Sequence, residues 1–247
     1  MLVTVLAVFA LSFGAIEQPL AQHGVTHQEP AAGSGSSHEH QGHSTVATEG
    51  WEGSVAGIAY SERNHHIAGW LVILMGLAEL SHALRLSSLG WARLLLPAAM
   101  TCTGFFVMVW SDHEAWPVGT LSFSETFFGH DAEIVQHKTY GILALLIGAV
   151  ELGRRLGRMG HVAWATPLPL MAIIGGLMLF GHSHGNHPSA HKIAMHHAVM
   201  GTMAISAGSS KLWSGFAARA TAGLSKWELL WAGLILLIGV QLLLYSE

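Results

Sequence analysis

The chain has 247 residues, of which 51% are hydrophobic and only 11% are charged, with a mean hydropathy of +0.44 and a formal net charge of −4. A soluble domain usually carries roughly a quarter charged residues, so this composition excludes an ordinary soluble enzyme and indicates a membrane protein. The sequence has no nucleotide-binding loop, dinucleotide fingerprint, nucleophile elbow or haem-attachment motif. It also lacks a basic patch, so we expect no nucleic-acid partner.

The amino-terminal segment is apolar but shorter than a typical membrane span. It reads MLVTVLAVFALSFGA and precedes small residues near Ala21, which predicts a secretory signal or an N-terminal anchor over residues 1–21. Residues 22–60 are rich in Gly, Ser, His and Glu without an apolar period, which predicts a flexible external tail. The histidines of this tail either gather metal loosely or have no specific role.

Six apolar windows follow the tail, near residues 66–86, 91–110, 134–153, 162–181, 193–213 and 227–245. Each has the roughly 20 residues that a helix needs to cross a hydrocarbon core of about 30 Å. The sequence therefore predicts an all-α bundle of six transmembrane helices over residues 61–247, in contact with lipid.

The basic residues predict the orientation of these helices. Eight of the eleven Lys and Arg residues lie at or near the junctions of the first and second, third and fourth, or fifth and sixth windows: Arg85, Arg93, Arg154, Arg155, Arg158, Lys211, Arg219 and Lys226. Such loops are cytoplasmic in membrane proteins. We therefore expect a bacterial inner-membrane protein whose His-rich N-terminal region, and sixteen of its eighteen histidines, face outward.

One motif recurs in the first, third and fifth windows: a His, a Gly four residues later, a Gly seven residues further, and a Glu or Lys three beyond that. Its copies are His65–Gly69–Gly76–Glu79, His137–Gly141–Gly148–Glu151 and His197–Gly201–Gly208–Lys211. The first two copies are 72 residues apart and the third is offset by 60. This predicts three hairpin units, about 61–130, 131–190 and 191–247, the last degenerate, around a pseudo-threefold axis. Whether the glycine stripe faces that axis or a neighbouring helix stays open.

The repeated histidines predict a metal site, because such an axis would bring His65, His137 and His197 to one depth at the outer end. Imidazole is a ligand for copper, zinc, iron and nickel. Further candidate metal ligands surround them: His196, Glu133, His130, His182, His184, His187, His191, His113, Asp112, Met200 and Met203. Cys102 is the single cysteine, which excludes a multi-thiolate site. Methionine sulfur favours Cu(I), so we expect copper first and zinc second.

The last residues of the motif predict a second feature. Glu79, Glu151 and Lys211 each lie fourteen residues after the motif histidine, about 21 Å along an ideal helix. They would form a ring near the cytoplasmic side. This ring is either a proton or cation relay or a set of local ion pairs, such as Glu151 with Arg154 or Arg155.

Three functions remain open at this stage. The first is a copper-binding protein that collects copper at its outer face and stores, transfers or translocates it, with a periplasmic metal chaperone as a partner. The second is a b-type cytochrome in which two of His65, His137, His197 and His196 ligate haem b. The third is a membrane metalloenzyme with an open position at a three-His site, for which the sequence identifies no substrate.

The external His-rich tail, the multiple spans, and the His and Met residues at the outer helix ends make the chain similar to bacterial copper-resistance membrane proteins of the D type. The resemblance covers the organisation of the six-span region. It implies copper handling in a bacterial inner membrane and carries over no individual binding residue.

Overall fold

The computed structural model describes residues 51, 53–86, 90–181, 189–217 and 224–247. All of these belong to one compact unit that spans residues 44–247. Within these ranges the regular structure is helical and contains no strand. The predicted signal or anchor and residues 22–50 of the predicted tail lie outside the described residues.

Six long helices carry the fold of the part of the chain that the structure describes, one at each predicted window. They are α3 (Val55–Ala83), α4 (Leu95–Trp110), α6 (Ala132–Arg155), α7 (Pro167–Leu179), α8 (Ala190–Ala217) and α9 (Lys226–Leu243). The shorter elements are η1 (Gly90–Leu94), α5 (Phe123–Phe128) and η2 (Val162–Ala165). Helix α3 begins inside the segment that we expected to be tail, because the Ser54 side chain accepts a hydrogen bond from the Gly57 amide and caps the helix.

Among the described residues, four helical segments are long and apolar enough to cross a membrane: Val55–Ala83, Trp91–Trp110, Val162–Leu179 and Lys226–Leu243. Several apolar helices of this length are what a multi-pass membrane protein requires. Helices α6 and α8 have comparable lengths but contain more polar residues. Some of these polar residues point into the bundle, since Lys138, Glu151 and His197 are all buried.

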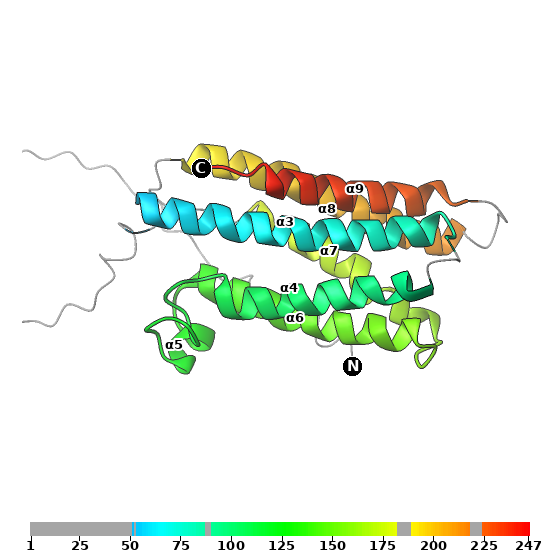
Figure 1. Cartoon of the computed structure of the whole chain (residues 1–247), viewed down its shortest axis with the longest axis horizontal. Helices are drawn as coiled ribbons and strands as arrows, with labels where there is room; N and C mark the ends of the chain where they lie inside the picture. Colours follow the sequence, from blue (N-terminus) through cyan, green and yellow to red (C-terminus); the bar gives the residue numbers. More distant parts are fainter. Residues whose placement is uncertain (1–50, 52, 87–89, 182–188, 218–223) are drawn as a thin grey trace, which may run out of the picture. The chain divides into compact units, whose positions relative to one another are not determined.

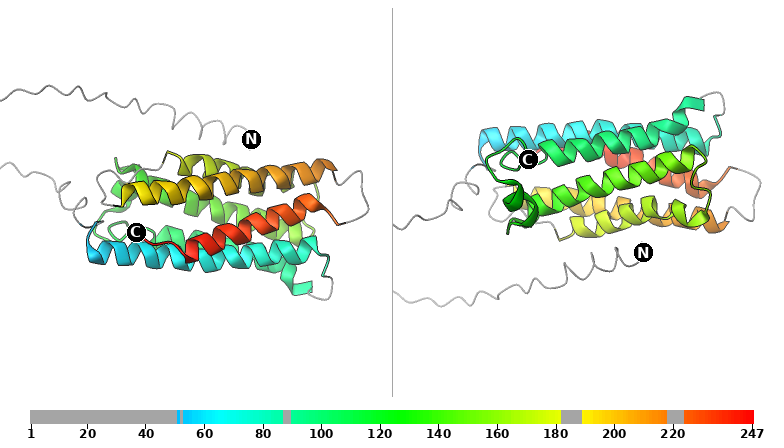
Figure 2. Two further views of the ribbon diagram at one scale, coloured as in Figure 1. Left: turned by 90° about the horizontal axis from the view of Figure 1, so that it is seen from above. Right: turned by 90° about the horizontal axis from the view of Figure 1, so that it is seen from below.

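The closest helix pairs are not the predicted hairpins. Figure 1 shows α3 lying along α9, and α4 lying along α6. Helices α7 and α8 form the third close pair and also lie side by side in the views from above and below (Figure 2). By contrast α6 and α7, which belong to one predicted hairpin, touch only briefly. The helices that pack together most closely are therefore not the two helices of each hairpin predicted from the sequence.

Each close pair is joined by two glycines that face each other across the interface. The pairs are Gly69 with Gly239, Gly141 with Gly104, and Gly201 with Gly176. A Cβ atom added to the α3, α6 or α8 member of a pair would lie between 2.6 and 3.1 Å from the carbonyl oxygen of its partner. Only glycine allows backbones to approach this closely. The glycine stripe of the motif thus faces a neighbouring helix, which decides the alternative that the sequence left open.

An apolar core fills the middle of the bundle. Its buried members are Ala78, Leu96, Met100, Ile147, Leu168, Ala207 and Trp231. Ile147 and Ala207, which lie ten residues after the second and third motif histidines, belong to this core, and the equivalent Met75 packs against it. The core separates a cavity at one end of the helices from a network of ion pairs at the other.

The ion-pair network contains the predicted ring of Glu79, Glu151 and Lys211. Lys211 Nζ lies 2.8 Å from Glu79 Oε2, and Arg155 pairs with both Glu79 and Glu151. Glu151 also pairs with Arg154, as the local ion-pair alternative expected. Both glutamates are at most 1% exposed. At such depth a carboxylate is stable only when it is paired, so the network holds this end of the bundle together.

Candidate functional site

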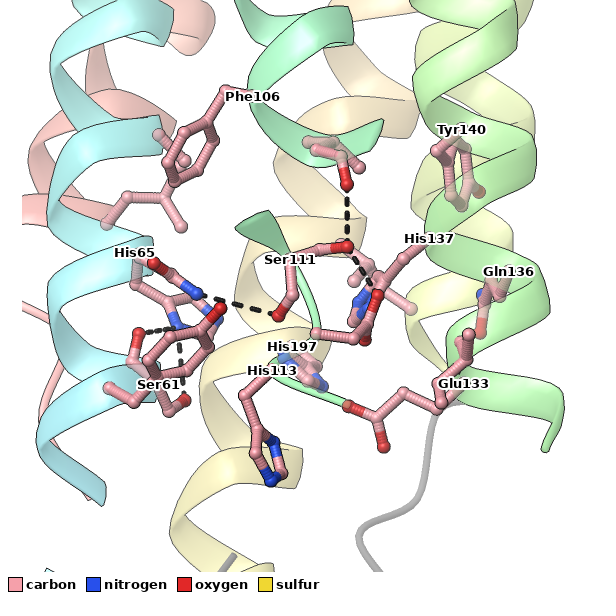
Figure 3. Close-up of a pocket in the computed structure, with 18 of the residues that line it drawn as sticks. Ser61, His65, Phe106, Ser111, His113, Glu133, Gln136, His137, Tyr140 and His197 are labelled. Carbon is pink, nitrogen blue, oxygen red and sulfur yellow. Dashed lines mark hydrogen bonds and ion pairs between the residues drawn. The ribbon is translucent and has the colours of Figure 1, made fainter. Parts of the chain in front are cut away.

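A cavity with a volume of about 390 Å³ lies at the end of the bundle opposite the network. His65 of α3, His137 of α6 and His197 of α8 all line it. Figure 3 shows these imidazoles on three different helices around one space. The motif histidines therefore share one cavity, as the sequence predicted, and Ala68, Tyr140 and Met200, three residues further along each helix, line it as well.

Two helix termini shape one side of this cavity. Helix α4 ends at Trp110, so the residues that follow it project into the cavity. Helix α6 begins after Asp131, whose side chain accepts hydrogen bonds from the backbone amides of Glu133 and Ile134. This cap fixes the first turn of α6, and with it the position of His137 one turn further on.

Asp112 holds the imidazole of His137. The Nδ1 atom of His137 lies 2.7 Å from Oδ1 of Asp112, and Lys138 Nζ lies 3.1 Å from Oδ2 of the same carboxylate. Burial by itself would raise the pKa of Asp112, but His137, Ser111 and Lys138 together hold this pKa below its ordinary value. The carboxylate is therefore ionised and accepts the Nδ1 proton of His137.

His65 is held in a similar way by its own helix. Its Nδ1 atom lies 2.9 Å from the backbone carbonyl oxygen of Ser61, which can only accept a hydrogen bond. The ring also stacks on Tyr245, with centroids 3.8 Å apart. In the neutral rings of both His65 and His137, Nδ1 thus carries the proton and the lone pair lies on Nε2.

His113 and Trp51 form part of the cavity wall. Their rings stack with centroids 3.4 Å apart, and His113 Nε2 lies 3.5 Å from Glu114 Oε1. Burial lowers the pKa of His113, and it outweighs the neighbouring Glu114 and Asp112, which act in the opposite direction. His113 is therefore neutral at physiological pH.

The predicted site residues divide into three groups. Seven line the cavity: His65, His137, His197, Glu133, His113, Asp112 and Met200. Four described residues do not line it, namely His196, His130, His191 and Met203. His191, His196 and Met203 lie on other faces of α8 than His197 and Met200, and His130 lies before the start of α6. The other three, His182, His184 and His187, lie outside the described residues.

The side chains that line the cavity do not form a preformed metal site. Among the residues that the structure describes, no three His, Cys, Asp or Glu side chains are close enough to hold one metal ion. The expectation of three histidines already converged on a single point is therefore not met by this arrangement. They share a cavity and stand apart within it.

Sequence analysis missed several polar residues in and beside the cavity, among them Asn64, which lines it, and Lys138, which pairs with its Asp112. Lys138 is 0% exposed and pairs with Asp112. Asn64 is 8% exposed and donates a hydrogen bond to the Trp110 carbonyl oxygen.

Lys138 has no equivalent lysine in the other copies of the motif, so the repeat gave no signal for it. Asn64 precedes His65 as Gln136 precedes His137, and both amides line the cavity, so the repeat did offer a signal at this position. Lys138 directly follows the motif histidine His137 in an apolar helix, and this position could have indicated from the sequence that the lysine is buried.

Fold and cavity together define a helical multi-pass membrane protein with a histidine-lined cavity at one end. No protein-family model, no curated protein and no solved structure matches the chain.

Proposed function

We propose that the protein binds copper in the cavity lined by His65, His137 and His197, and passes it on or translocates it at the outer face of a bacterial inner membrane. The observation that carries the proposal is the orientation of two imidazoles. A carboxylate holds Nδ1 of His137 and a backbone carbonyl oxygen holds Nδ1 of His65. Metal-binding histidines are held in this way, because it directs the Nε2 lone pair at the metal.

Met200 supports copper over zinc. It lies on the same cavity wall as His197, one helical turn further along α8, and both side chains are 4% exposed. A thioether is a soft ligand that favours Cu(I), whereas zinc in proteins is held by His, Cys and carboxylates. Cu(I) is satisfied by few ligands, so the proposal requires only a few of these nitrogen and sulfur atoms to meet at one ion.

The test is the metal content of the purified protein after loading with Cu(I). We expect stoichiometric copper in the wild type and loss of the tightly held ion in the double variant His137→Ala/His197→Ala. The matched control is His191→Ala/His196→Ala, which removes two histidines of α8 that do not line the cavity and is expected to keep the copper. Full retention of copper by the cavity variant would overturn the proposal.

An absorption spectrum of the same preparation separates copper binding from the cytochrome alternative. Histidines on two helices of one cavity are also what bis-His haem ligation uses. A Soret band with sharp bands after reduction would support haem b in place of copper. The metalloenzyme alternative uses the same three histidines and predicts turnover of a small substrate at the loaded site.

The proposal includes a membrane arrangement in which all six long helices span the bilayer as three related copies. Large apolar side chains in the middle of α6 and α8 support this, since Leu146 is 59% and Val199 51% exposed. Contact with lipid stabilises such surfaces. The three equivalent glycine pairs support the relation between copies. The basic residues of the network end, Arg154 and Arg155 among them, favour an inward orientation of that end.

Cysteine labelling tests this arrangement. In a Cys102→Ser background, a cysteine at Thr120, between α4 and α5, is expected to react with a membrane-impermeant maleimide on intact cells. A cysteine at Arg158, between α6 and η2, is expected to react only after the cells are broken. The reverse pattern would contradict the orientation, and reaction of both on intact cells would contradict the crossing of α6.

A further inference from the structure

The apolar core between the cavity and the network contains three methionines. Met100 of α4 is a buried member of this core, and Met75 of α3 and Met171 of α7 pack against it. They come from three different close helix pairs, which are α3 with α9, α4 with α6, and α7 with α8. Each close pair therefore contributes one thioether to the middle of the bundle.

The second glycine of each motif copy marks the depth at which these methionines lie. Because the three motif histidines share one cavity, the glycines eleven residues further along their helices share one level as well. Met75 immediately precedes Gly76 in α3. A Cβ atom added to Gly148 of α6 would lie 3.4 Å from Cβ of Met100. Met75 and Met100 are therefore at the same level of the bundle.

Met171 belongs to this level too. A Cβ atom added to Gly208 of α8 would contact the backbone of Pro169 and of Ile173 in α7. Met171 lies midway between these two residues in the same helix. The three methionines thus surround the core at one depth, one from each close helix pair.

This level lies between the cavity and the network. The second glycine of each copy comes eleven residues after the motif histidine and three residues before Glu79, Glu151 or Lys211. These separations correspond to about 17 Å and about 5 Å along a helix. Met200 of the cavity lies three residues after His197, so about 10–12 Å of helix separates it from the level of the three methionines.

The chemistry of methionine suits the passage of Cu(I) through an apolar interior. A bare ion that enters such a core without ligands is strongly destabilised. Thioether sulfur is a soft, uncharged ligand that favours Cu(I). The methionine side chain is unbranched and has three rotatable bonds, so its sulfur atom can move toward an ion. Three thioethers at one level can therefore replace the ligands that the ion leaves behind.

A second cavity lies on the network side of this level. It has a volume of about 230 Å³ and is lined by His82, Glu151 and Leu168, among others, and Leu168 is also a buried member of the core. The cations around it are each paired with a carboxylate: Arg154 with Glu151, Arg155 with Glu79, and Lys211 with Glu228. The core and its methionines thus separate two cavities, one at each end of the bundle.

We infer that Met75, Met100 and Met171 form a relay site that carries Cu(I) through the core, from the histidine-lined cavity to the cavity at the network end. This inference rests on the proposed function and selects translocation among its alternatives. The transfer is a ligand exchange without electron transfer. A bond from copper to Met200 breaks as a bond to one of the three core thioethers forms, and the ion stays Cu(I).

The test is Cu(I) transport by the purified protein in liposomes that enclose a Cu(I)-responsive fluorescent chelator. The triple variant Met75→Leu/Met100→Leu/Met171→Leu removes the three sulfur atoms and keeps the apolar volume, a change that cores tolerate well. We expect it to keep the tightly held copper of the cavity and to transport at least tenfold more slowly than the wild type. Met195→Leu is the matched control, because the Met195 side chain of α8 is 59% exposed, and it is expected to transport at the wild-type rate.

Transport at the wild-type rate by the triple variant would overturn the inference, because packing alone would then account for the methionines. If the triple variant also lost the copper of the cavity, the single variants Met75→Leu, Met100→Leu and Met171→Leu decide. Each is expected to keep that copper and to lower the transport rate at least twofold. Wild-type rates in all three would overturn the inference.

The two proposals fail in different ways. If the wild type binds no Cu(I), the copper function is wrong and the relay falls with it. If the wild type binds Cu(I) in the cavity but transports none, or if the triple variant transports as fast as the wild type, the relay is wrong and copper binding in the cavity stands.

Discussion

Gly201 of α8 and Gly176 of α7 face each other so closely that a Cβ atom on either would lie within 2.7 Å of the carbonyl oxygen of the other. The variant Gly201→Ala is therefore expected to force the two helices apart. Overpacking of this kind costs about 1–3 kcal/mol. The measurement is thermal unfolding of the purified protein in detergent, where the variant should unfold at a lower temperature than the wild type.

Gly233→Ala is the control for this substitution. Gly233 lies within α9, and a Cβ atom added there would have nothing within 4 Å. Alanine is the better helix former, so this variant should be as stable as the wild type or more stable by up to ~1 kcal/mol. Equal destabilisation by both variants would show that the glycine contact between α7 and α8 is not what holds them together.

Asp112→Asn is expected to weaken copper binding without removing a metal ligand. The amide cannot hold the His137 imidazole as the carboxylate does, and loss of such a partner typically lowers metal affinity 10–100-fold. Competition with a Cu(I) chelator measures the affinity. Asp131→Asn is the control, since asparagine also caps a helix and the Asp131 side chain accepts its hydrogen bonds from the backbone amides of Glu133 and Ile134. An unchanged affinity in Asp112→Asn would mean that His137 needs no such support.

The positions of the six long helices and the common cavity of the motif histidines could be predicted from the sequence. Hydrophobic length places a helix, and a fixed spacing of His65, His137 and His197 within equivalent helices places them at one depth. The choice of packing partners could not be predicted in this way. The contact between Gly69 and Gly239 joins the first long helix to the last, and nothing in the local sequence of either identifies the other.

The chemistry of the cavity was predictable only in part. His196 and His197 are neighbours in the sequence, but the rotation of about 100° per residue in a helix lets only one of them face the cavity. The pairing of Lys138 with Asp112 depends on how α6 lies against the end of α4. Such a tertiary contact leaves no periodic signal in the sequence.

The network at the other end of the bundle is expected to be essential for stability. Glu79→Gln would leave Lys211 and Arg155 without their shared carboxylate, and breaking a buried ion pair from one side costs about 3–5 kcal/mol. Unfolding by a denaturing detergent would measure the loss. The double variant Glu79→Gln/Lys211→Met should recover part of it, whereas strictly additive losses would show that the two residues do not interact.

The N-terminal tail is expected to affect delivery of copper and not its retention. A variant lacking residues 22–50 loses five histidines of the predicted tail and keeps all those of the cavity. Its copper content after saturation should equal that of the wild type, while its uptake at limiting copper should be slower. Loss of the tightly held ion at saturation would place the binding site in the tail.

The most direct test of a copper site in the cavity is a crystal structure of the Cu(I)-loaded protein with an anomalous difference map at the copper absorption edge. We predict the strongest peak inside the cavity, within bonding distance of Nε2 of His137 and of at least one further ligand among His65, His197 and Met200. A strongest peak elsewhere in the chain, with none beside these imidazoles, would contradict the account.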